Sequence, residues 1–274
     1  MTHNDVSAGQ VAVLRRYPVK SMLGEWCRSL DIGPMGVVGD RRYAVIDGES
    51  GRVATAKNPR LWRRLLECTA TTSSGGVVVT LPGGDDVPVA DAAGPLSRLL
   101  GRDVHIADER SAGAVLERPD PDDVLTRGLD AETEIVLLEL AQGAPGGAFV
   151  DHSPVHLVAT STLDALGFDL AESVRYRPNI VVQTPDGTPP FVENDWVGAR
   201  IRLGEVVLRA TMPTPRCSVP TLEHGTLGRC PHSVRYPQEH NHVQAAGFGV
   251  LPCAGLYAEV VTGGTVTAGD SVQI

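Results

Sequence analysis

One cysteine of the chain, Cys217, lies in a stretch framed by prolines, MPTPRCSVPT (residues 212–221). Each proline restricts its own φ and pushes the preceding residue out of the helical region. The stretch is therefore expected to form a stiff loop that holds the thiol in place. The neighbouring cation, Arg216, favours the thiolate over the thiol. Such a thiolate suits a nucleophile or a metal ligand, although a buried structural cysteine would fit the same pattern.

Cations recur beside turns and strand ends in a chain whose net charge is −9. Arginine forks and hydroxyl groups are what a phosphate or a carboxylate needs, and lysine supplies a compact point charge. Any one cation is explained equally well as a solvated charge, but together they predict one anionic ligand held at the end of a barrel. The clusters are Lys20-Ser21, Arg41-Arg42, Lys57-Asn58-Pro59-Arg60, Arg175-Tyr176-Arg177-Pro178-Asn179 and Arg216.

Composition bounds the remaining function classes. The chain has 274 residues, of which 42% are hydrophobic and 21% charged, as in ordinary globular proteins. The acidic balance argues against nucleic-acid binding. No leader and no apolar run of membrane-spanning length is visible, so neither membrane insertion nor secretion is expected, and a cytoplasmic location is predicted. The five cysteines are widely spaced without CxxC, which favours reduced thiols. Glycine-rich nucleotide-binding motifs and a GxSxG elbow are also lacking.

The first half of the chain is expected to be built from short strands. Apolar, β-branched runs predict strands over 11–17, 26–32, 41–47 and 77–81, separated by turn signals typical of a small barrel. A short helix is predicted around 95–100. Residues 103–134 are acidic and contain Pro119-Asp120-Pro121, so they are predicted to be an exposed connector or a domain boundary.

The second half carries clearer signals. Strands are predicted over 155–159 and 180–183, with a short helix over 160–167 between them. A hairpin over 196–203 and 206–212 should deliver the chain to the Cys217 loop, and two strands, 256–261 and 271–274, should close the domain. Residues 223–243 contain Cys230-Pro231-His232 and His240-Asn241-His242. That spacing matches no common zinc site, so a polar helix–loop segment is expected.

Taken together, the motifs resemble MOSC proteins that carry an N-terminal MOSC β-barrel module. This resemblance implies a mainly β (α+β) fold, with the small barrel module over residues 1–125 and the MOSC domain, with a few short helices, over residues 126–274. The likeness extends to the amidoxime-reducing component and its bacterial counterparts. The motifs are Tyr17-Pro18-Val19-Lys20-Ser21, Gly39-Asp40-Arg41, Ala56-Lys57-Asn58-Pro59-Arg60, Asp151-His152-Ser153-Pro154, Arg177-Pro178-Asn179, residues 198–204, Arg216-Cys217 and residues 264–272.

The resemblance also implies a cofactor, molybdenum–molybdopterin, and roles for individual residues. Cys217 would ligate molybdenum and be the catalytic residue, since a soft thiolate suits this metal. Phosphate-holding residues would be Lys20, Ser21 and Arg41. Contacts from the MOSC half would be Ser153, Arg177 and Asn179, while Lys57, Arg60 and Arg216 would lie close to the phosphate. His152 departs from relatives that commonly carry a small hydroxyl residue there.

The activity implied is oxygen-atom transfer that reduces small N-hydroxylated or N-oxide substrates. Because no ferredoxin-type cysteine cluster is present, electrons would come from a separate protein such as a ferredoxin or a flavin reductase. The alternative is a sulfur-transfer protein that carries a persulfide on Cys217, since MOSC domains also occur in sulfur-carrying enzymes. A non-catalytic anion-binding module remains a third possibility, and an anion site of the pyridoxal phosphate type is not excluded. Substrate, donor and oligomeric state are left open.

Overall fold

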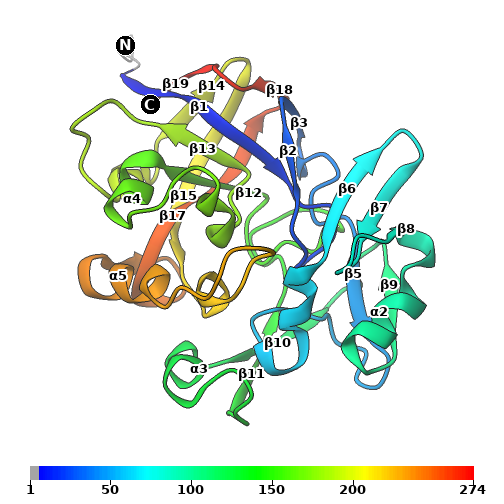
Figure 1. The fold of residues 1–274 in the computed structure, drawn as a ribbon. Coiled ribbons are helices and arrows are strands. Elements are labelled where there is room, and N and C mark those ends of the chain that lie inside the picture. The colour runs from blue at the N-terminus through cyan, green and yellow to red at the C-terminus, as the bar shows by residue number, and fades with distance from the viewer. Residues whose placement is uncertain (1–5) are drawn as a thin grey trace.

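Seven strands close into a barrel in the computed structural model, which describes residues 6–274 (Figure 1). The ring runs β12–β13–β1–β19–β14–β15–β17, and β12 also pairs with β17, which closes it. The β12–β13 pair is parallel and the other neighbours are antiparallel. The strands are β1 (Ser7–Arg16), β12 (Val155–Ala159), β13 (Ile180–Gln183), β14 (Arg200–Leu203), β15 (Val206–Pro215), β17 (Gly249–Thr262) and β19 (Ser271–Gln273).

Strand β1, the first within the described residues, belongs to this barrel, which is otherwise built from the second half. β1 pairs with β13 in a register that places Leu14 opposite Ile180. Further early strands join the same body, because β3 (Ser29–Gly33) pairs with both β4 (Gly36–Val37) and β18 (Gly264–Thr267). Side chains from both ends of the sequence therefore share one apolar core. The two remaining attached strands are β2 (Glu25–Cys27) beside β1 and β16 (His242–Ala245) beside β17.

The rest of the N-terminal half forms a second body around its own core, which includes Met22, Trp62 and Leu96. Its strands are short and pair locally: β5 (Ala44–Asp47) with β9 (Val104–Ala107), and β6 (Thr69–Ser73) with β7 (Gly76–Thr80) and β8 (Asp86–Pro88). Helices cover it: α1 (Pro59–Trp62), η1 (Arg63–Glu67), η2 (Val89–Asp91) and α2 (Ala93–Leu100). The mainly β fold class is confirmed, and so is the short helix expected around 95–100.

Three predictions for the first half are wrong in detail. The strand over 26–32 is broken into β2 and β3. The strand over 41–47 begins only at Ala44, because Arg41 has a positive φ of 46° that no strand residue adopts. The segment 103–134 is not a plain connector, since it contains β9, β10 (Val115–Pro119) and α3 (Pro121–Arg127). Its acidic residues begin α3, where the Asp120 side chain accepts a hydrogen bond from the Asp122 amide at 2.8 Å.

The second half follows its predictions closely. The strands over 155–159 and 180–183 are β12 and β13, and the helix between them is α4 (Thr160–Ala165). The hairpin is β14–β15, although Trp196 lies in η4 (Val192–Trp196) before it. The histidine-bearing region forms α5 (His232–His240). Two further helices are η3 (Glu172–Tyr176) and η5 (Val219–Thr221), and β11 (Ile135–Glu139) pairs with β10. Within residues 6–274, none of the helices has the length and apolar character needed to cross a membrane.

Candidate functional site

A pocket between the barrel and the N-terminal body is lined by nine of the ten residues predicted for the site. Its lining contains seven Lys or Arg residues but only two carboxylates, Glu139 and Asp151, so it is strongly cationic in a chain of negative net charge. The tenth predicted residue, Arg60, was expected to lie close to the phosphate but is not part of the pocket. It lies outside the lining and forms an exposed ion pair with Glu132 at 2.7 Å. The predicted residues in the lining are Lys20, Ser21, Arg41, Lys57, Ser153, Arg177, Asn179, Arg216 and Cys217.

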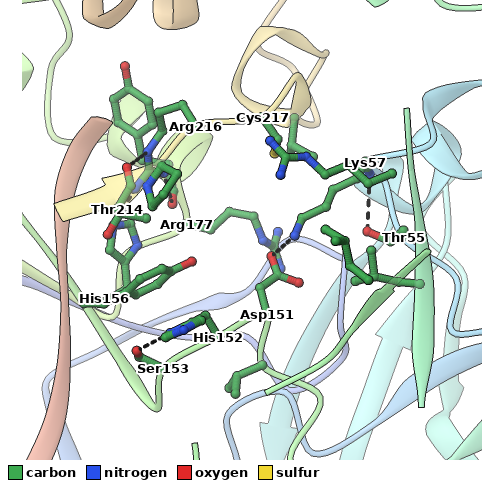
Figure 2. A pocket seen from close by; sticks show the side chains of 18 of the residues that line it. Thr55, Lys57, Asp151, His152, Ser153, His156, Arg177, Thr214, Arg216 and Cys217 are labelled. Carbon is green, nitrogen blue, oxygen red and sulfur yellow. Dashed lines mark hydrogen bonds and ion pairs between the residues drawn. The ribbon is translucent and has the colours of Figure 1, made fainter. Parts of the chain in front are cut away.

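The Cys217 segment differs from the expected loop. Strand β15 continues through Pro213 and Pro215, which lie opposite Leu256 and Cys253 of β17, with irregular register where the prolines interrupt the ladder. The Arg216 amide then donates to the Pro252 carbonyl at 2.9 Å. Cys217 follows directly and is a free, half-buried thiol beside the pocket (Figure 2). The rigid support expected from prolines is therefore provided by a strand end.

The Arg216 side chain is held by partners within the protein. Its guanidinium is buried and donates to the carbonyl of Thr214 at 3.1 Å and to Nε2 of His156 at 2.9 Å. Because a guanidinium can only donate, the Nε2 atom of His156 must be an acceptor and the ring is neutral. Burial, and then the charge of Arg216, hold the pKa of His156 well below its usual value. Lys57 interacts electrostatically with Cys217.

The only two lysines of the chain share one carboxylate, Asp151. The Lys20 ammonium donates to Asp151 and to the Phe149 carbonyl, and the Lys57 ammonium lies 3.1 Å from the other oxygen of Asp151. Burial alone would raise the pKa of Asp151, but the two ammonium groups outweigh it and hold that pKa well below its usual range. Burial lowers the pKa of Lys20 to about 8, against the opposing effect of Asp151. Asp151 points into the centre of the pocket (Figure 2).

The side chains of Arg41 and Arg177 form another wall of the pocket, and both pack against the ring of Tyr17. Arg41 and Arg177 each lie 4.4 Å from the centre of the Tyr17 ring. Arg41 is held by Asp40 and by the Arg177 carbonyl at 3.0 Å. Arg177 donates to the Met22 carbonyl at 2.7 Å, while its second terminal nitrogen is buried with no hydrogen-bond partner among the described residues. Burial, and then Arg41, lower the pKa of Arg177 to about 10.

Backbone strain marks the same wall. Three of the five non-glycine residues with positive φ in residues 6–274 line this pocket: Ser21 at 64°, Arg41 at 46° and Arg177 at 56°. Such conformations are costly for side chains with a Cβ and concentrate at ligand sites. Their concentration here supports a binding role for the pocket.

The remaining predicted residues, Ser21, Asn179 and Ser153, form hydrogen bonds that hold neighbouring segments of the pocket in place. The Ser21 hydroxyl accepts from the Ala56 amide at 3.1 Å. Asn179 bridges β12 and β1, accepting from the His156 amide at 3.2 Å and donating to the Arg15 carbonyl at 3.3 Å. Ser153 is bonded to Nδ1 of His152 at 2.9 Å. These groups fix the walls that carry the charged side chains, and each also faces the pocket.

Several lining residues were missed by reasoning from the sequence. Thr214 is buried and its hydroxyl has no hydrogen-bond partner among the described residues. Arg118 reaches the pocket from β10, inside the segment predicted to be a connector. His156 and Tyr257 lie within predicted strands and had no signal beyond their residue type. Asp151 belonged to a recognised motif, and its position between the lysines depends on tertiary structure.

These features define a class: a mainly β protein in which two β modules enclose a cationic pocket with a free thiol on its wall. Comparison with family models agrees with this class. Residues 145–273 match the MOSC domain, and residues 8–107 match the MOSC N-terminal beta barrel domain. The chain is therefore a MOSC-domain protein with an N-terminal MOSC β-barrel module. MOSC domains are found in molybdenum-cofactor-binding proteins. The boundary at residues 125/126 stays a prediction.

Comparison with individual proteins adds little. A crystal structure of the YuaD protein from Bacillus subtilis is 10% identical with a TM-score of 0.43, and the alignment covers 98% of this chain and 96% of that one. A crystal structure of YiiM from Geobacillus stearothermophilus is 13% identical with a TM-score of 0.30, covering 60% of this chain and 74% of that one. Neither likeness is strong enough to carry an argument. No curated protein matched the chain.

Proposed function

We propose that the chain is a molybdenum-cofactor-binding oxidoreductase that reduces N-hydroxylated or N-oxide compounds, with Cys217 as the molybdenum ligand. The observation that carries the proposal is a half-buried free thiol that lines the same pocket as seven cationic side chains. When bound, molybdenum–molybdopterin would supply two-electron oxygen-atom chemistry beside this thiol.

The donor set fits such a group. A soft thiolate is a suitable ligand for molybdenum, and the phosphate of a pterin cofactor needs donors that the protein has not already used. Two such donors are present: one terminal nitrogen of Arg177 and the hydroxyl of Thr214 are buried without partners among the described residues. Because an unpartnered buried polar group costs free energy, a ligand that accepts from both would be favoured.

The residues of the pocket would each perform a definite task in this proposal. Arg177, Arg41 and Lys20 would hold the phosphate, and the Arg216–His156 pair would fix the end of β15 that carries Cys217. Lys57 would place a positive charge near Cys217. In the overall reaction the N–O bond breaks, two electrons and two protons are consumed, and water leaves. We include in the proposal a separate electron donor, either a ferredoxin or a flavin reductase.

The deciding experiment is metal and pterin analysis of protein purified from a host that makes the cofactor. We expect near-stoichiometric molybdenum in the natural chain and background levels in Cys217→Ala. The matched control is Cys230→Ala, which removes another half-buried thiol that does not line the pocket. It should retain the metal. Absence of molybdenum together with cyanide-labile sulfur on Cys217 would contradict the proposal and support persulfide transfer instead.

A further inference from the structure

Three aromatic rings form one wall of the pocket. They have no part in the roles proposed above for the Cys217 thiol and for the lysine and arginine side chains. The His152 ring is stacked with the Tyr257 ring at a centroid distance of 5.6 Å, and it meets the Phe248 ring edge-on at 5.5 Å. All three residues line the pocket. His152 precedes β12, Tyr257 lies on β17, and Phe248 lies in the turn between β16 and β17. These are favoured geometries for aromatic pairs, so the wall is an ordered surface.

The local backbone holds His152 in this position. Its Nδ1 atom is bonded to the Ser153 hydroxyl, and its carbonyl accepts from the Gly143 amide at 3.1 Å. The ring lies so close to Gly143 that a Cβ placed there would be 2.5 Å from Cε1 of His152. Any larger residue at position 143 would therefore displace the His152 ring.

The wall extends from the interior of the pocket to its rim. Phe248 remains 38% exposed, so part of an apolar ring faces solvent at the edge of a cationic pocket. At the inner end, the Tyr257 hydroxyl lies within electrostatic range of Asp151, Lys57 and Cys217. A flat molecule that entered from solvent and stacked on this wall would thus direct one end toward Cys217. By contrast, the phosphate-type donor Lys20 is buried, with 5% exposure.

We propose that His152, Tyr257 and Phe248 select substrates whose N-oxygenated group is carried on a flat aromatic or heteroaromatic ring, in preference to aliphatic ones. This inference rests on the proposed reductase function and names the substrate class of the same pocket. The ring would stack on the wall, and its N–O group would lie toward Cys217. The reaction is the one given above, with the N–O bond broken and water released.

The test compares two matched amidoximes, benzamidoxime and acetamidoxime, as substrates of the cofactor-loaded protein. The ratio of their kcat/KM values measures the contribution of the ring. We expect this ratio to fall roughly three- to tenfold in Phe248→Ala and in His152→Ser, the range for losing one aromatic contact. Gly143→Ala should lower it as well, because it displaces His152 without removing a ring. Val250→Ala, at an exposed position outside the pocket lining, is the control and should not change the ratio.

Two further measurements separate the outcomes. Binding of benzamide and acetamide, measured by calorimetry, reports the same preference without turnover, and benzamide should bind more tightly. Molybdenum content should be unchanged in the wall variants. An unchanged kcat/KM ratio, equal binding of the two amides, or loss of molybdenum from the variants would each overturn the inference, the last because the wall would then hold the cofactor. If neither amidoxime is reduced, the proposed function fails, and the amide binding ratio still decides whether the wall prefers rings.

Discussion

Two walls of the pocket differ in how completely their polar groups are paired. On the wall of the N-terminal body, Lys20 and Arg41 are bonded to carboxylates and carbonyls of the protein itself. On the wall formed by the end of β15, the Thr214 hydroxyl has no partner among the described residues, and the Cys217 thiol is free. We infer that the contacts of the paired wall stabilise the fold as well as placing its cations, whereas the polar groups of the unpaired wall gain their partners only from a ligand.

The largest effect is expected at Asp40, which holds Arg41 of the paired wall in place. Its carboxylate is buried, accepts from the Tyr17 amide at 2.8 Å and pairs with Arg41. Asp40→Ala would leave a largely buried guanidinium and an amide without their partner, which should lower the free energy of unfolding by about 3 to 5 kcal/mol in urea denaturation. The control, Glu132→Ala, breaks the exposed pair with Arg60 and should cost under about 1 kcal/mol. Equal losses in the two variants would contradict the stabilising role of the paired wall.

The next effect is a difference in protonation between the two lysines. Lys20 should titrate near its lowered pKa of about 8, and Lys57 above the ordinary lysine value, where burial is outweighed by Asp151. With only two lysines in the chain, NMR of the labelled ε-amino groups resolves each one. Asp151→Asn should lower the pKa of Lys20 further, because the carboxylate favours its ammonium form. Two lysines titrating together near pH 10.5 would contradict the structure.

These shifts have opposite consequences for stability. Between about pH 8 and 10.5, Lys20 is less protonated in the folded chain than in the unfolded chain, so its contribution to the free energy of unfolding rises with pH. Lys57 binds its proton more tightly when folded, so its stabilising contribution is lost as pH rises through its raised pKa. In Lys20→Met, the urea midpoint measured across this pH range should no longer include the increase with pH that Lys20 contributes in the natural chain. A midpoint profile identical to that of the natural chain would show that Lys20 is not the group responsible.

Much of the site could be predicted because its residues stand beside turns and strand ends that are local in sequence. Strand β13 has the predicted bounds, and it is preceded by Arg177 and Asn179. The sequence did not predict the direction in which a side chain points. Arg216 is adjacent to Cys217 in sequence, yet its guanidinium is bonded to His156 from β12. Sequence proximity could not reveal this, because the partner lies 60 residues away.

The pairing of distant segments was equally invisible. Strand β1 completes a barrel that is otherwise formed by residues after 150, and local patterns predict strands without predicting their neighbours. The acidic segment was misread for a related reason. Its prolines and aspartates indicated a connector, but Asp120 and Pro121 are also well suited to start a helix, and the strand before that helix carries Arg118 to the pocket.

The smallest and most discriminating effect concerns Thr214. Its hydroxyl is buried without a partner among the described residues, so Thr214→Val should leave the free energy of unfolding within about 1 kcal/mol of the natural chain. The matched control is Thr162→Val, at a buried hydroxyl that donates to Glu193 and accepts from the Phe191 amide, both at 2.8 Å. That change should cost about 1 to 3 kcal/mol.

Ligand retention should show the reverse order. Thr214→Val should reduce molybdenum per chain by roughly two- to tenfold, since one hydrogen bond to the bound group is removed, while Thr162→Val should retain the metal in whatever fraction remains folded. Urea denaturation and metal analysis on the same preparations measure both quantities. If Thr214→Val destabilised the chain as much as Thr162→Val and kept its molybdenum, the hydroxyl would serve the fold, and the polar groups at the end of β15 would not depend on a ligand for their partners.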